Sequence, residues 1–116
     1  MKDDRVYLLN IIECIEWIQN YTSSGEEEFM KSRLVQDAVN RNLEIIGEAT
    51  KRISVKLKEK NMQIPWRQMA GLRDVLIHDY MGVNTKTVWN VVQNELPQLL
   101  IMVKKLISTT PPREEN

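Results

Sequence analysis

Apolar residues recur every three or four positions along most of the chain, which is the spacing of one face of an α-helix. The first stripe predicts a helix over residues 3–20, and the second predicts a long helix over residues 32–58. A third helix is expected over residues 65–80, and a fourth from about residue 84 to residue 107. The stripes contain Leu8, Ile11, Ile15 and Ile18; Val35, Val39, Leu43, Ile46, Ile53 and Leu57; Trp66, Met69, Leu76 and Tyr80; and Val88, Val92, Leu96, Leu99, Val103 and Leu106.

Residues beside these stripes and between them complete the prediction. Trp17 broadens the first stripe and Leu34 borders the second. A polar break follows the first helix, with a short helical turn expected at residues 26–28. Pro65 suits the first position of the third helix, and Pro97 is expected to kink or divide the fourth helix near Glu95.

Short connections between the helices predict an all-α fold, an antiparallel bundle of four to five helices. The helical domain is expected to span residues 1–107. Residues 108–116 have two prolines and no apolar pattern, so we expect a disordered C-terminal tail.

Composition and charge narrow the classes of function. The chain has 16 basic and 16 acidic residues, so only a local patch could attract nucleic acid, and the best one is residues 51–60. The single Cys14 excludes an internal disulfide and suits the reducing cytoplasm, where we expect the protein. The first residues do not follow a signal-peptide pattern, and no apolar run approaches the roughly 18 residues of a membrane span.

A cluster of polar residues interrupts the third stripe. Arg73 lies within it, and His78, the only histidine, follows five residues later. On one helix Arg73 and Tyr80 lie two turns apart on one face, and Asp74 lies one turn from His78. Arginine can hold a phosphate with two hydrogen bonds, and histidine is the usual acid–base group near neutral pH. The pair suits RNA cleavage by attack of the 2′-hydroxyl, although a lone histidine near a helix end is also common as a cap or packing residue.

A charged row on the second helix also allows two interpretations. Arg41, Glu44, Glu48 and Arg52 recur at spacings of three and four, as in exposed ion pairs on a solvated face. Alternatively, Arg41 or Glu48 reaches a polar cleft and supports a site there. The chain has no glycine-rich phosphate loop, no paired cysteines and no pair of histidines, so we expect neither a metal nor a cofactor.

The segment RDVLIHDY (residues 73–80) resembles the Arg-x-x-x-x-His-x-Tyr signature of HepT toxins, which belong to the HEPN superfamily. The segment NRNLEIIGEA (residues 40–49) is similar to the second-helix segment of that family. Residues 64–66, 71–74, 78–82, 88–89 and 96–97 also resemble it, in family order. The resemblance extends from the first helix to about residue 107. Asp74 stands where the family often has asparagine.

The resemblance implies a dimeric HEPN bundle in which two motif copies share one cleft. It implies a metal-independent endoribonuclease, with RNA as substrate, that acts as the toxin of a toxin–antitoxin system. His78 would be the general acid or base, Arg73 would bind phosphate, and Asp74 would orient them. Tyr80 matches the tyrosine that the partner antitoxin, an MNT-type nucleotidyltransferase, modifies with AMP. Two alternatives stay open: a non-catalytic HEPN partner of a nucleotidyltransferase, and a helical dimerisation protein with a structural polar cluster.

Overall fold

The computed structural model describes residues 3–78 and 85–111, and it describes the side chains of residues 3–72 and 85–111. The elements are α1 (Asp4–Tyr21), α2 (Glu26–Lys31), α3 (Arg33–Arg52), α4 (Val55–Lys60), α5 (Trp66–His78), α6 (Thr85–Asn90), the π-helical turn η1 (Val91–Glu95) and α7 (Leu96–Thr109). Within this part of the chain there is no strand. The predicted all-α fold is therefore confirmed.

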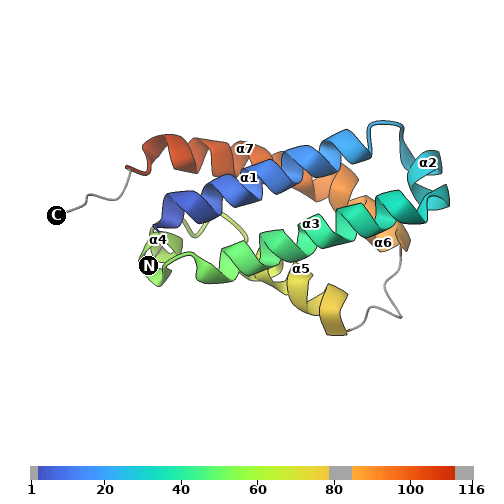
Figure 1. Cartoon of the computed structure of the whole chain (residues 1–116). Helices are drawn as coiled ribbons and strands as arrows, with labels where there is room; N and C mark the ends of the chain where they lie inside the picture. The colour runs from blue at the N-terminus through green and yellow to red at the C-terminus, as the bar shows by residue number, and fades with distance from the viewer. Residues whose placement is uncertain (1–2, 79–84, 112–116) are drawn as a thin grey trace.

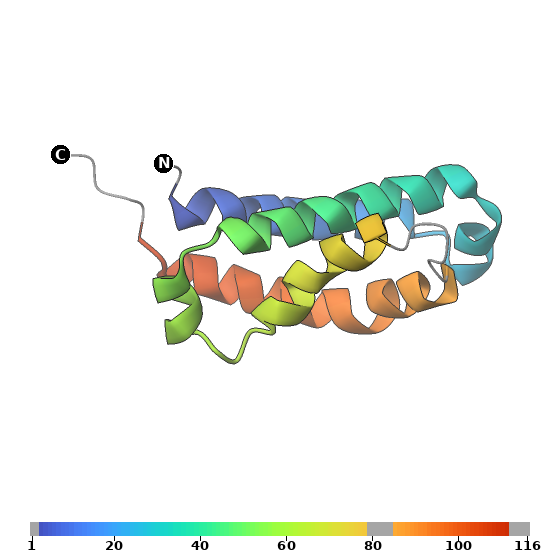
Figure 2. The same cartoon turned by 90° about the horizontal axis from the view of Figure 1, so that it is seen from below.

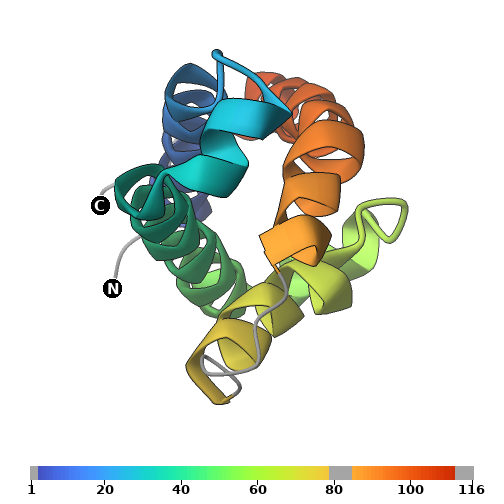
Figure 3. The same cartoon turned by 90° about the vertical axis from the view of Figure 1, so that its right-hand side faces the viewer.

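The helices α1, α3 and α5 and the continuous α6–η1–α7 segment run in alternating directions along the molecule (Figure 1). Helix α3 packs against both α1 and α5, and α1 also packs against α7. Seen end-on, α1, α3, α5 and the α6–η1–α7 segment surround the interior (Figure 3). Helix α5 crosses obliquely between α3 and the α6–η1–α7 segment, and its C-terminal end lies on the α3 side (Figure 2). None of the helices that the structure describes is long and apolar enough to cross a membrane.

Among the residues whose side chains the structure describes, every predicted stripe residue is buried or packs against the core, but two residues beside the stripes do not. Trp17 is 48% exposed and Leu34 is 82% exposed, so their assignment to the buried stripes was wrong. Each is a neighbour in sequence of a stripe residue and is therefore turned about 100° away from it around the helix. Among the described side chains, the large fully or almost fully buried ones are Leu8, Ile11, Ile15, Ile18, Phe29, Val39, Leu43, Ile46, Thr50, Met69, Leu96 and Val103.

The prediction of one continuous helix over residues 32–58 is wrong in one place, because α3 ends at Arg52 and a separate helix, α4, begins at Val55 in a new direction. Ile53 is extended, with φ −68° and ψ 140°. The Ser54 hydroxyl caps α4 by accepting a hydrogen bond from the amide of Leu57 at 3.2 Å. The amide and hydroxyl of Ser54 in turn donate to the Asp4 carboxylate at 2.8 and 2.7 Å. A contact between residues 50 positions apart therefore ends the helix, while buried Ile53 maintains the apolar pattern across the break.

The expected division of the last helix near Glu95 is confirmed. Residues 91–95 form a π-helical turn, and the amide of Leu96 donates to the carbonyl of Val91, five residues earlier. Pro97 lies just beyond it and has no N–H to continue the ordinary ladder. The π-turn therefore absorbs the interruption, and the chain continues as α7 without a separate loop.

The predicted tail begins too early, because α7 continues to Thr109. The Arg5 guanidinium donates hydrogen bonds to the carbonyls of Ile107 at 2.9 Å and Thr110 at 2.7 Å. These bonds satisfy carbonyls that a helix end leaves without an intrahelical partner. Residues 112–116 of the predicted tail lie outside the described residues.

Candidate functional site

Helix α5 carries the polar motif, and its first turn is fixed to the rest of the molecule. The Pro65 carbonyl accepts from the amide of Met69 at 3.1 Å, so the helix begins one residue later than predicted. The buried Trp66 donates its indole N–H to the carbonyl of Asn61 at 3.0 Å. Met69, one turn further on, is almost fully buried. These contacts set where the remainder of α5 starts and in which direction it runs.

The backbone of α5 is helical without a break from Trp66 to His78. Arg73, Asp74 and His78 therefore lie on one helix, as the sequence predicts, with Arg73 and His78 about 7.5 Å apart along its axis. Their side chains lie outside the described residues, as does all of Tyr80. The contacts among these four candidate residues stay predictions.

The charged row on α3 forms the exposed ion pairs that one of the two interpretations predicted. Arg41, 71% exposed, pairs with Glu44 at 3.1 Å, and Arg52 pairs with Glu48 at 3.0 Å. Hydrogen bonding to Glu48, and secondly to Tyr7, raises the pKa of Arg52 above its usual value. Exposed pairs of this kind contribute little to stability, because solvent screens the attraction.

Glu48 also borders a shallow groove, but this groove lies between α3 and α1. Its wall on α1 contains Tyr7 and Asn10, and its wall on α3 contains Ile45, Glu48 and Arg52. A part for Arg41 or Glu48 in a catalytic cleft stays a prediction. In the described part of the chain, no group of three or more His, Cys, Asp or Glu residues could hold a metal ion.

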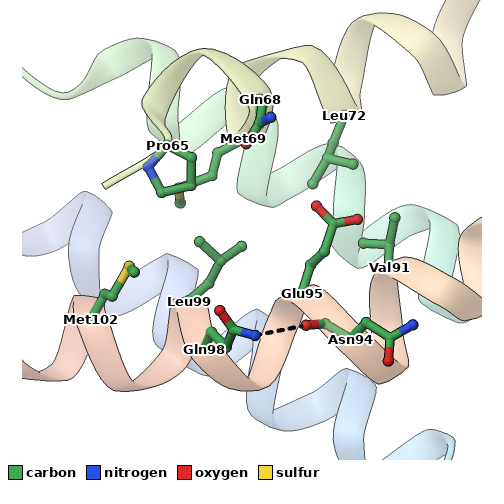
Figure 4. A pocket seen from close by; sticks show the side chains of 10 residues that line it. All are labelled: Pro65, Gln68, Met69, Leu72, Val91, Asn94, Glu95, Gln98, Leu99 and Met102. Carbon is green, nitrogen blue, oxygen red and sulfur yellow. Dashed lines mark hydrogen bonds between the residues drawn. The ribbon is translucent and has the colours of Figure 1, made fainter. Parts of the chain in front are cut away.

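A second groove, which sequence reasoning missed, lies between the first half of α5 and the η1–α7 segment (Figure 4). It has a volume of about 210 Å³. Its polar side chains are Gln68, Asn94, Glu95 and Gln98, and its apolar ones are Pro65, Met69, Leu72, Val91, Leu99 and Met102. The sequence carries one signal of this groove, which is Pro97 between Glu95 and Gln98. A proline inside a helical pattern marks an irregular backbone.

Residues 11–106 match the model of the HepT-like family, described as "Ribonuclease HepT-like". The chain is similar to "Probable ribonuclease HepT" of Thermococcus cleftensis, with 44% identity over 101 residues, which are 86% of this chain and 92% of that protein. It is 39% identical over 116 residues to "Putative RNase MJ1216" of Methanocaldococcus jannaschii, covering 99% of this chain and 96% of that protein.

A third relative, from the same Methanocaldococcus, is longer. It is named "Gamma-glutamylcyclotransferase and putative RNase MJ0434" and is 40% identical over 116 residues, 99% of this chain. This chain spans only 52% of that protein's length. No solved structure matches the chain significantly. The family model covers most of the helical bundle, including all of α5, so the resemblance seen in the sequence is confirmed and the chain belongs to the HepT-like ribonuclease family.

Proposed function

We propose that this chain is a metal-independent endoribonuclease that acts as the toxin of a type VII-like toxin–antitoxin system. The observation that carries the proposal is the family match over residues 11–106, which includes the Arg73–His78 pair on the unbroken helix α5. The relatives named as ribonucleases support the same class of substrate, which is RNA.

In the proposed reaction the 2′-hydroxyl of the RNA attacks the adjacent phosphorus. The new bond closes a 2′,3′-cyclic phosphate, and the bond to the 5′-oxygen breaks to leave a 5′-hydroxyl. One proton must leave the nucleophile and another must reach the leaving oxygen, which is acid–base work suited to His78. Arg73 would stabilise the charge on the phosphate oxygens, and Asp74 would orient the pair.

The proposed assembly is a homodimer in which the motifs of two copies face one cleft. Each chain supplies only one histidine, so two copies would provide separate groups for the two proton transfers. A two-fold axis brings identical segments together, which suits a shared cleft built from α5 and its symmetry mate. Sedimentation of the full chain at micromolar concentration tests the assembly, and a monomer that cleaves RNA would contradict it.

Control by a partner completes the proposal. An MNT-type nucleotidyltransferase antitoxin would transfer AMP from ATP to the Tyr80 hydroxyl, forming a phosphodiester and releasing pyrophosphate. Tyr80 is two residues from His78, so the added bulk and negative charge would oppose RNA binding. Tyr80→Phe should escape modification and remain toxic in the presence of the partner, as intact-mass spectrometry and growth assays would report.

The catalytic assignment is tested with Arg73→Ala and His78→Ala, and with Arg67→Ala as the matched control. Arg67 is an exposed arginine on the same helix, so its loss should leave cleavage unchanged. Loss of His78 should slow cleavage of a defined RNA by at least about 100-fold. EDTA should have no effect, and the products should have cyclic phosphate ends.

Two results would contradict this function. Full activity of His78→Ala would remove the acid–base role from this residue. A wild-type protein that binds nucleotides but cleaves no RNA would favour the non-catalytic HEPN partner instead.

A further inference from the structure

The groove between α5 and η1–α7 presents polar side chains to a space of suitable size for a flat ring. Its volume is about 210 Å³, and a cavity of about 150 Å³ is enough to hold benzene. The α5 wall contains Gln68 and Leu72, and the opposite wall contains Glu95 and Leu99. Figure 4 shows the Glu95 carboxylate pointing across the groove toward α5, near Leu72.

The carboxylate of Glu95 does not cap the helix that follows it. Glu95 is the residue before α7, but its side chain makes no capping hydrogen bond. The amide of Leu96 is already bonded to the Val91 carbonyl, and Pro97 has no N–H, so neither residue needs a side-chain cap. Glu95 is exposed and has no ion pair or side-chain hydrogen bond with the described part of the chain. Its two carboxylate oxygens point into the groove (Figure 4).

One helical face forms the wall of the groove opposite α5. Val91, Glu95, Gln98 and Met102 recur at spacings of four, three and four residues, so they lie on one face of the η1–α7 segment and line the same wall. The π-helical turn η1 forms part of this wall, and such turns occur frequently at functional sites.

We propose that this groove binds a guanine base of the RNA substrate, with Glu95 as the residue that recognises it. The proposal rests on the proposed ribonuclease function. An ionised carboxylate only accepts hydrogen bonds, and guanine presents two adjacent donors, N1–H and the 2-amino group, on its Watson–Crick edge. Uracil presents one donor between two carbonyl oxygens, which the carboxylate repels. Single-stranded RNA leaves these edges free for side chains.

The remaining groove residues suit the same ligand. The half-buried Leu72, Val91 and Met102 offer apolar surface to the faces of the ring. The side-chain amide nitrogen of Gln98 donates to the backbone carbonyl of Asn94 at 3.3 Å, which holds the Gln98 side chain in place. Gln68, on the opposite wall, can donate to the guanine O6.

The position of the groove fits a site for a nucleotide near the cleaved bond. Leu72 lines the groove and directly precedes Arg73 on α5. Leu72 and His78 are about 9 Å apart along the helix axis, so neighbouring nucleotides of one strand could reach both the groove and the motif. Glu95 would thus select the sequence that is cut.

The test compares wild type with Glu95→Gln, which replaces a carboxylate oxygen by an NH2 group of the same size. Glu13→Gln is the control, because Glu13 is an exposed glutamate on α1, outside the groove. GMP, AMP, CMP and UMP are each titrated into the full ¹⁵N-labelled chain. GMP should bind at least about tenfold more tightly than UMP and should shift the amides of residues 91–98. Glu95→Gln should lose that preference and Glu13→Gln should keep it.

Cleavage of a random-sequence RNA, with sequencing of the ends, gives a second measurement. Wild type should prefer guanine at one position near the cut, and Glu95→Gln should reduce that preference about tenfold. Equal affinity for the four nucleotides would overturn the proposal. A change in sedimentation with unchanged base preference would also overturn it and would identify the groove as an interface between protein chains. If wild type cleaves no RNA, the ribonuclease proposal fails, and the nucleotide titration still decides whether the groove binds guanine.

Discussion

Gly71 lies inside α5, two residues before Arg73, at a position where the fold does not require a glycine. A Cβ atom added there would meet no other atom within 4 Å. The φ angle of Gly71 is not in the left-handed region. Among the described glycines, only Gly25 has a φ angle in that region. Glycine within a helix is about 1 kcal/mol less favourable than alanine. Gly71→Ala is therefore expected to raise the free energy of unfolding by about 0.5–1 kcal/mol, and the Tm by about 4 °C.

Gly25 provides a matched control in which the same substitution should have the opposite effect. It precedes α2 with φ 95° and ψ 178°, a conformation that is essentially restricted to glycine. A Cβ there would also meet nothing within 4 Å, so only the backbone conformation opposes alanine. Gly25→Ala is expected to lower the free energy of unfolding by about 1–3 kcal/mol.

Urea unfolding followed by far-UV circular dichroism would measure both effects. All variants should be compared at one protein concentration, because the stability of a dimer depends on it. The slope against urea should not change, since neither substitution alters the surface exposed on unfolding. A Gly71→Ala variant less stable than wild type, or a Gly25→Ala variant as stable as wild type, would refute the reasoning. A stabilised Gly71→Ala that cleaves RNA poorly would indicate that the substrate or a second copy occupies the open space.

Two further predictions concern the scaffold. Ser54→Ala removes the cap of α4 and the hydroxyl bond to Asp4, so thermal unfolding should show that the free energy of unfolding falls by about 2 kcal/mol. As a control, Ser108→Ala removes only a local bond at an exposed position and should lower it by under about 0.5 kcal/mol. Equal losses in the two variants would contradict the tertiary role of Ser54. Burial, and secondly Glu13, raises the pKa of Cys14 from 9.0 to about 11. The folded state thus holds this proton more tightly, so stability is fully present below pH 9 and falls as the pH rises toward 11. Alkylation at pH 8 should follow unfolding, and rapid alkylation of the native protein would contradict this.

The sequence by itself determined the helical class, most of the core and the position of the motif. Helical hydrogen bonds and amphipathic spacing are local, so the rows around Leu8, Leu43 and Leu96 could be identified without a fold. The interruption by Pro97 was also predictable, because a missing N–H disturbs any helix whatever its surroundings. The motif residues Arg73 and His78 were recognised from their spacing and family resemblance, and their helix is continuous as expected.

Only the tertiary structure decided which residues of distant segments meet. The end of α3 depends on Asp4, 50 residues away from Ser54, and no periodicity encodes that contact. Trp17 is exposed because α1 buries the neighbouring face, which the pattern alone could not delimit. The groove with Glu95 exists because the fold brings α5 and the η1–α7 segment, two separate parts of the chain, to opposite sides of one space. Local sequence determines the hydrogen bonds within a helix, whereas a site between helices depends on how the whole core packs.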